Sequence, residues 1–184
     1  MSLRPLALLI SLLVPGLLHA EEVHRAPAIG IEVLVPDGWK LSTDGPMFTV
    51  LHEDPAVTLM FIPVDTGDAA QALEMLEPQL KPYLGKAEME PPTAITINGL
   101  TGITGDGKTK LDEISALVSL MSLVIDARRS VVVVGLAQEE GVDKVTYEVG
   151  RVLKSIRRLE LAKAPPAPTP KPAVDPAPPA ASPY

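Results

Sequence analysis

The residues whose spacing most clearly suggests chemistry lie at 102–109, where the chain reads GITGDGKT. This segment matches the phosphate-loop pattern G-x-x-x-x-G-K-[ST], in which backbone N–H groups cradle phosphates, the lysine reaches the terminal phosphates and the hydroxyl binds magnesium. The nucleotide-binding residues would then be Gly102, Gly107, Lys108 and Thr109. Nucleotide binding is therefore the alternative function that the sequence raises.

The surroundings of this segment do not suit a phosphate loop, which needs an apolar strand before it, a helix after it and a parallel sheet around it. The turn pair Asn98-Gly99 interrupts the chain just before the motif. The β-branched strand predicted at 130–137 does not end on the aspartate that a magnesium site would use. The sequence favours a glycine-rich hairpin turn at 105–108, and it predicts no cofactor.

The other reactive side chains form weaker candidates. His52, Glu53 and Asp54 bring three possible metal ligands together, but adjacent strand residues point to opposite faces, so a polar turn is favoured and no metal site is predicted. The chain has no cysteine, no G-x-S-x-G motif and no H-E-x-x-H motif. The lone tryptophan, Trp39, is interpreted as a core residue. We therefore predict no catalytic residues and no enzyme activity.

The first 20 residues have the layout of a secretory signal peptide: one basic residue, an apolar run and a small residue, Ala20, before an acidic pair. The apolar run is interrupted and shorter than the roughly 20 residues that span a membrane, so cleavage after Ala20 is favoured over a retained anchor. The mature chain is expected to be periplasmic or extracellular, without a membrane span. ATP is scarce there, which further weakens the nucleotide alternative.

Composition limits the remaining choices. The formal net charge of −7 provides no basic stripe, which argues against a nucleic-acid partner. Residues 162–184 are almost entirely proline, alanine and a few polar residues, and such a segment is expected to be a disordered tail or a spacer. After a polar lead at 21–28, the remaining residues, 29–161, are enough for one domain with an aliphatic core.

Apolar and β-branched stretches predict strands at 29–35, 47–52, 57–62, 93–97, 100–104 and 130–137. Turn residues between them predict hairpin tips at Asn98-Gly99, Gly105–Lys108 and Asp126–Arg129. The stretch 114–125 fits a helix and a strand equally well, because its apolar residues satisfy both periods.

Apolar residues three and four apart predict a helix over 68–84, with a kink or restart near Glu77 because two prolines interrupt it. A more regular amphipathic helix is predicted over 142–159. Acidic residues lie near its start, and Arg157 and Arg158 lie near its end, where each charge complements the helix dipole.

This order of elements resembles the PsbP-like fold, as in the extrinsic photosystem II subunit and the DcrB-like exported bacterial proteins. The local likeness lies in Pro36-Asp37-Gly38-Trp39, Ile97-Asn98-Gly99-Leu100 and Val152-Leu153-Lys154-Ser155-Ile156. The resemblance implies an α+β domain whose antiparallel sheet of about six to seven strands is flanked by two main helices, with a strand at 114–125. It also implies a binding or assembly-assisting protein without a shared catalytic site. The signal peptide, the missing catalytic constellation and the proline-rich tail favour an exported domain that binds an unknown protein or a cell-envelope component.

Overall fold

A computed structural model describes residues 21–85, 87–111 and 114–160. The predicted signal peptide and the proline-rich tail lie outside these residues. The strands are β1 (Glu22–Ala26), β2 (Ile31–Val35), β3 (Lys40–Asp44), β4 (Met47–Glu53), β5 (Ala56–Val64), β6 (Glu88–Met89), β7 (Thr93–Ile97), β8 (Leu100–Leu111), β9 (Ile114–Asp126), β10 (Arg129–Gln138) and β11 (Arg157–Arg158). The helices are α1 (Ala69–Leu84), the 3-10 helix η1 (Val142–Lys144) and α2 (Thr146–Ser155).

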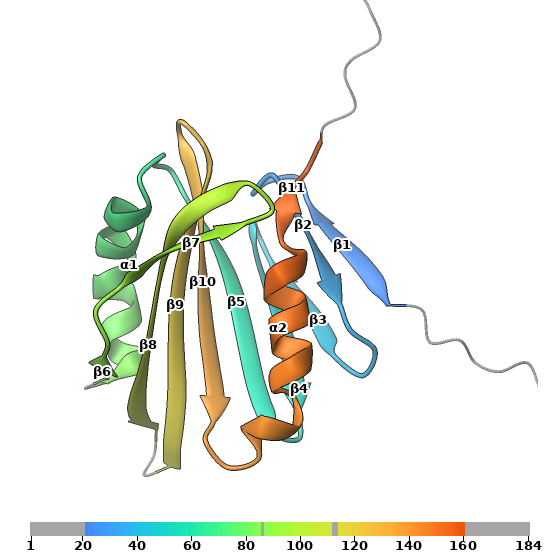
Figure 1. Cartoon of the computed structure of the whole chain (residues 1–184), viewed down its shortest axis with the longest axis vertical. Helices are drawn as coiled ribbons and strands as arrows, with labels where there is room; N and C mark the ends of the chain where they lie inside the picture. Colours follow the sequence, from blue (N-terminus) through green and yellow to red (C-terminus); the bar gives the residue numbers. More distant parts are fainter. Residues whose placement is uncertain (1–20, 86, 112–113, 161–184) are drawn as a thin grey trace, which may run out of the picture.

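Eight strands form one antiparallel sheet with the order β3-β4-β5-β10-β9-β8-β6, in which β7 also pairs with β8 (Figure 1). A smaller sheet, β1-β2-β11, packs beside it. The predicted α+β class is confirmed, with more strands than expected. The ambiguous stretch 114–125 lies in β9, so the strand that the resemblance implied is confirmed.

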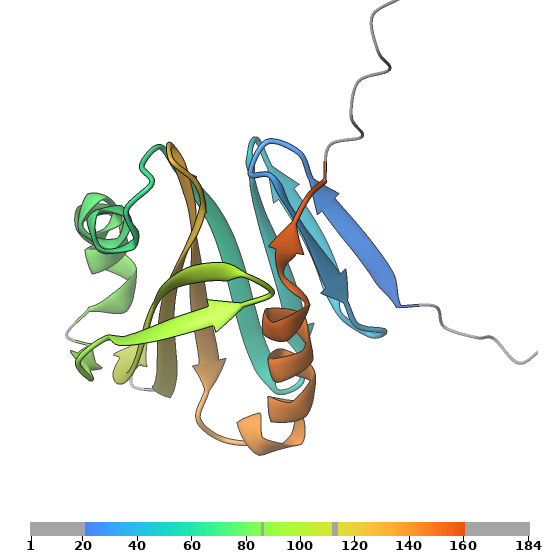
Figure 2. The ribbon, with the colours of Figure 1, turned by 45° about the horizontal axis from the view of Figure 1, so that its top comes forward.

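Both faces of the large sheet are covered, because successive side chains of a strand point to opposite sides. Val132 and Val134 on β10 pack against α1. Val131 and Val133 point the other way, into a core shared with α2 and the smaller sheet (Figure 2). This explains why β10 reads as an unbroken valine run, and burying each such side chain stabilises the fold by about 1.5–3 kcal/mol.

Helix α1 begins at the N-cap Asp68, whose carboxylate accepts hydrogen bonds from the N–H groups of Ala70 and Gln71 at 2.8 and 3.0 Å. It continues without a restart to Leu84, so that part of the prediction is wrong. Pro78 and Pro82 are tolerated on its exposed side, since the opposite side is held by aliphatic residues on the sheet. No helix of the described residues is long and apolar enough to cross a membrane.

The closing helix is shorter than predicted, because α2 ends at Ser155. The chain then extends, and Arg157 and Arg158 form β11 on the free edge of β2, where the Arg157 guanidinium binds Glu32. The two arginines therefore pair with a strand instead of complementing the helix dipole. Pairing with β2 satisfies backbone groups that an extra helical turn would have left to solvent.

Two hydrogen bonds that involve side chains fix α2 to β2 and to the connection between β2 and β3. The Trp39 indole Nε1–H donates to Glu148 Oε2 at 2.8 Å, and the Leu34 N–H donates to Ser155 Oγ at 2.8 Å. Trp39 is 7% exposed, so its interpretation as a core residue is confirmed.

Two polar strands were not predicted. The lead at 21–28 contains β1, which pairs with β2 over its whole length, and the segment after Trp39 contains β3. Most β1 residues and all β3 residues are exposed, so neither strand has the alternation of apolar and polar residues that marks a half-buried strand.

Candidate functional site

The segment Gly102–Thr109 lies inside β8 and forms neither a turn nor a phosphate loop. It pairs residue by residue with β9, and parts of it also pair with β7 or β6 on the other side. The predicted hairpin tip at Gly105–Lys108 is therefore wrong. No helix follows the motif, because the next described element is β9, and the sheet ladder occupies backbone groups that a phosphate would need.

The motif's lysine and threonine also serve separate structural contacts. Lys108 Nζ lies 2.6 Å from Glu139 Oε1, and this hydrogen bond raises the pKa of Lys108. The buried Thr109 hydroxyl donates to the Leu84 carbonyl at the end of α1, at 2.6 Å. Neighbouring strand residues point to opposite faces, so these two side chains cannot meet on one nucleotide.

The glycines of the motif allow close packing of backbones. A Cβ on Gly107 would lie 2.6 Å from both the Glu88 carbonyl oxygen and Met89 Sδ, and a Cβ on Gly102 would lie 1.8 Å from the Ser122 carbonyl oxygen. The curve of β8 carries the β7–β8 tip across the sheet towards α2 (Figure 1). The glycines are thus needed where other strands lie against β8, as glycine in a strand interior often is.

Replacing Lys108 by alanine tests the motif directly. Isothermal titration calorimetry with Mg-ATP is expected to give no binding heat for wild type or Lys108→Ala, and the unfolding midpoint is expected to change little, because exposed ion pairs contribute little to stability. Lys110→Ala, on the same strand, is the matched control. Saturable heat in wild type and Lys110→Ala that disappears in Lys108→Ala would show that the motif does bind nucleotide.

Of the predicted turn His52-Glu53-Asp54, only Asp54 lies in the β4–β5 connection, because His52 and Glu53 end β4 and pair with Val57 and Ala56 of β5. His52 Nδ1 lies 3.0 Å from the Pro55 carbonyl oxygen, so the ring contributes to the turn. Within the described ranges, no three histidine, aspartate or glutamate side chains are grouped so as to hold a metal ion.

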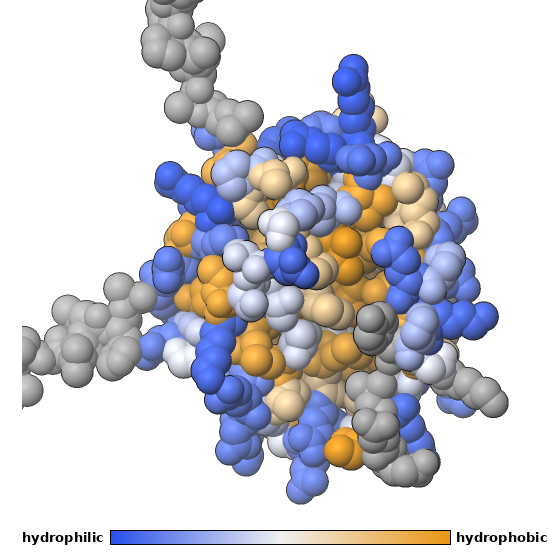
Figure 3. Space-filling model, turned by 180° about the vertical axis from the view of Figure 1, so that it is seen from behind, coloured by the Kyte–Doolittle hydropathy of each residue, from blue (hydrophilic) through white to orange (hydrophobic). Residues whose placement is uncertain are grey.

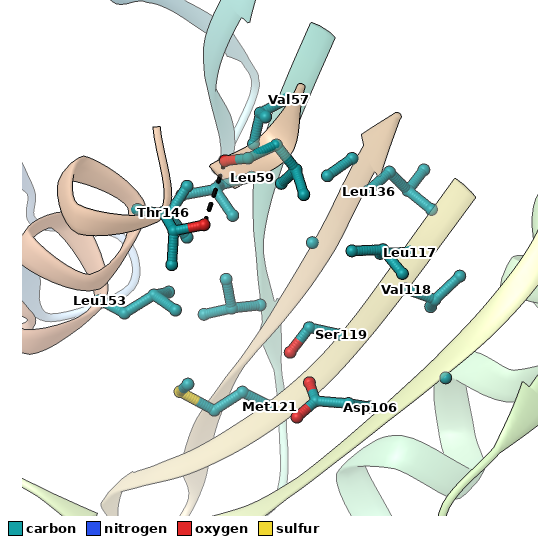
Figure 4. Close-up of a pocket in the computed structure, with 16 residues that line it drawn as sticks. Val57, Leu59, Asp106, Leu117, Val118, Ser119, Met121, Leu136, Thr146 and Leu153 are labelled. Carbon is teal, nitrogen blue, oxygen red and sulfur yellow. Dashed lines mark hydrogen bonds between the residues drawn. The ribbon is translucent and has the colours of Figure 1, made fainter. Parts of the chain in front are cut away.

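A hollow of about 340 Å³ lies on the α2 side of the large sheet (Figure 4). Its floor is one row of paired residues across four strands: Asp106 on β8, Ser119 on β9, Gly135 on β10 and Leu59 on β5. Ser119 and Gly135 are small, so the middle of the row lies lower than its neighbours. The register of four strands therefore creates the hollow.

Its walls are almost entirely apolar. The neighbouring rows contribute Val57, Leu117, Met121, Val133 and Ala137. The region of α2 contributes Val142, Thr146, Val149 and Leu153. The hollow thus has an aliphatic lining on the sheet and on the helix, which suits an apolar ligand.

Polar groups gather at one end of the hollow, where the oxygens of Asp106 and Ser119 lie close together (Figure 4). The Thr146 hydroxyl does not join them, because it donates to the Val142 carbonyl at 3.0 Å. Among the described residues, no lysine, arginine or histidine forms an ion pair with Asp106. One carboxylate and one hydroxyl are thus presented to a molecule in the hollow.

Neither described histidine lines the hollow, so neither is placed to activate Ser119 there. His24 packs against Phe48, with ring centroids 4.7 Å apart, and its partial burial lowers its pKa. His52 lies near the end of β4, where its Nδ1 is 3.0 Å from the Pro55 carbonyl oxygen. The geometry of the hollow supports binding, because its lining is apolar apart from Asp106, Ser119 and Thr146.

Sequence reasoning missed these residues because the hollow depends on strand register. Two local signals were present: Gly135 ends the valine run of β10, and Ser119 lies among aliphatic residues of β9. Asp106 was assigned to a turn. Only the pairing of β8, β9, β10 and β5 places the three side by side.

The chain has a PsbP-like fold, as the resemblance predicted. No family model and no curated protein matches the chain. Among solved structures, it is similar to the cyanobacterial PsbP protein CyanoP of Synechocystis sp. PCC 6803, with a TM-score of 0.51 and 17% identity, over 78% of this chain and 95% of that one.

Two other structures share the fold. LpqN, involved in cell envelope biogenesis of Mycobacterium tuberculosis, has a TM-score of 0.55 and 18% identity, over 71% of this chain and 83% of that one. The Saccharomyces cerevisiae Ran-binding protein Mog1p has a TM-score of 0.51 and 10% identity, over 77% of this chain and 96% of that one. Identities this low show a common fold alone. The nearer likeness to DcrB-like proteins stays a prediction.

Proposed function

We propose that this protein is an exported, non-catalytic binding domain that takes up a cell-envelope component in the hollow beside α2. The observation that carries the proposal is the hollow itself: about 340 Å³ of space with aliphatic walls and two polar groups at one end. Ligand sites commonly combine a concave apolar surface of about 300–1,000 Å³ with a few polar groups that orient the ligand.

Export is supported by the signal-peptide pattern of the first 20 residues. A binding role is supported by fold relatives whose names record one, Ran-binding for Mog1p, and an envelope setting by the cell-envelope biogenesis role of LpqN. The nucleotide alternative loses its structural basis, because Gly102–Thr109 is a paired strand.

Site-specific photocrosslinking tests this proposal. Thr146 is exposed at the rim of the hollow, and Thr43 is exposed on β3, at the far edge of the large sheet. A benzophenone amino acid at 146 is expected to capture a discrete component of an envelope extract, whereas the same group at 43 captures none. Since both variants change an exposed threonine, the Thr43 variant is the matched control.

Two results would contradict the proposal. One is equal labelling from both positions, or labelling from neither. The other is turnover of a hydrolase or nucleotide substrate by the purified mature protein, lost on a single point substitution.

A further inference from the structure

We propose that the ligand of the hollow is a cationic amphiphile: a molecule with an aliphatic body that fills the space beside α2 and an amine that binds Asp106. This inference rests on the proposed function, because it assigns a ligand class to the same hollow. It makes a stronger claim, since it specifies the charge of the ligand and the residue that recognises it.

The lining selects the aliphatic body. The walls consist mainly of aliphatic side chains on three neighbouring strands and in the region of α2, with no aromatic ring on which a planar ligand could stack. A flexible hydrocarbon chain fits such a surface, and each buried methylene is expected to tighten binding by about fourfold until the space is full. Gly135 deepens the floor between Ser119 and Leu59, whose side-chain atoms lie 3.3 and 3.4 Å from where its Cβ would be.

The charge at one end selects the amine. Of the 16 residues that line the hollow, none is basic and Asp106 alone is acidic. The nearest lysine of the same strand face, Lys108, is paired with Glu139. An anionic head group would therefore meet Asp106 without a compensating cation, whereas an ammonium group would gain a charge-assisted hydrogen bond. Ser119 offers a second oxygen beside it.

Calorimetric titration with three eight-carbon probes tests the inference: octylamine, octanol and octanoate, each below its micellar concentration. Wild type is expected to bind octylamine about three- to fivefold more tightly than octanol, as a partly exposed charge pair allows, and octanoate on the order of tenfold more weakly than octylamine. The preference for the amine is expected to shrink at high salt.

Three variants assign the effect to residues. Asp106→Asn keeps the side-chain shape and is expected to bind octylamine and octanol equally. Asp44→Asn removes an exposed carboxylate at the far edge of the sheet and is expected to behave as wild type. Ser119→Leu fills the floor and is expected to weaken binding of all three probes by at least about tenfold, the loss that a few unburied methylenes would cause. Circular dichroism melts establish that each variant is folded.

The inference is overturned if octanoate binds as tightly as octylamine, or if Asp106→Asn keeps the amine preference. It is also overturned if no probe binds. In that case, if crosslinking from position 146 persists, the proposed function is retained with a different ligand. Loss of both signals removes the proposed function as well.

Discussion

Gly102→Ala is expected to destabilise the domain by about 3 kcal/mol or more, near the upper end of what overpacking causes. The added Cβ would lie 1.8 Å from the Ser122 carbonyl oxygen, and the obstacle is backbone of β9 that cannot turn aside as a side chain would. Because β9 pairs with both β8 and β10, the clash would force the middle of the sheet apart. Urea unfolding followed by circular dichroism measures the loss.

Gly150→Ala is the matched control. Gly150 lies inside α2, and nothing lies within 4 Å of an added Cβ, so alanine is expected to stabilise the domain by about 0.5–1 kcal/mol. If Gly102→Ala lowers the free energy of unfolding and Gly150→Ala raises it, the result would support the strand pairing of β8. Unchanged stability of Gly102→Ala would contradict the strand at the glycine-rich motif and reopen the phosphate-loop alternative.

Asn98→Ala is expected to cost about 2–3 kcal/mol. The Asn98 amide donates to the carbonyl oxygens of Lys154 and Ile156, both at 2.8 Å, so the β7–β8 tip closes the end of α2. Each lost bond costs roughly 1 kcal/mol, and alanine adds about 1 kcal/mol of strain because this residue has φ of 47°.

Two further substitutions separate the cost of the lost hydrogen bonds from the cost of the backbone strain. Asn98→Gly accommodates the positive φ and loses only the hydrogen bonds, so it is expected to be less destabilising than alanine. Asn98→Asp keeps the shape and the tolerated backbone, but its carboxylate faces two carbonyl oxygens without a proton to donate, so it is expected to be worse than glycine. Thermal melts of the three proteins rank them. An aspartate variant as stable as wild type would contradict the described contact.

Gly102 and Asn98 both affect how the β7–β8 tip contacts α2. Gly102 lies in β8, whose curve brings the Asn98 tip to α2 (Figure 1), and α2 forms one wall of the hollow. Substitutions that weaken the contact between the β7–β8 tip and α2 are therefore expected to influence binding, even though neither Gly102 nor Asn98 lines the hollow.

Local signals in the sequence predicted much of the fold. Asn98-Gly99 is a tight turn with positive φ at both residues, and Asp126–Arg129 closes the β9–β10 hairpin, as their composition indicated. The strand at 114–125 needed the resemblance, because periodicity allowed either structure. The helix α1 followed from its apolar spacing.

The wrong predictions have a common physical cause: the role of these residues is set by contacts with segments that are distant in the sequence. Gly105 and Gly107 resemble turn residues, but they are small because the chain around Glu88–Glu90 lies against them. Arg157 and Arg158 continue a helical pattern, yet the free edge of β2 draws them into a strand. The hollow likewise depends on the alignment of four strands, which local pattern does not encode.

A second apolar surface offers an internal comparison. On the side away from α2, half-buried apolar side chains lie next to the α1 core, and apolar surface gathers in the middle of that view (Figure 3). They include Met60, Ile62 and Leu120. Since the proposed binding site lies on the opposite face, this surface is expected to stay unchanged when the ligand binds.

Methyl NMR of the mature protein, titrated with envelope extract, tests directly whether the hollow beside α2 is the binding site. We expect shifts for the methyl groups of Leu117, Val133 and Leu153, which line the hollow, and no change for Met60 and Ile62 on the opposite face. Shifts confined to Met60 and Ile62, or no shifts at all, would contradict binding in the hollow.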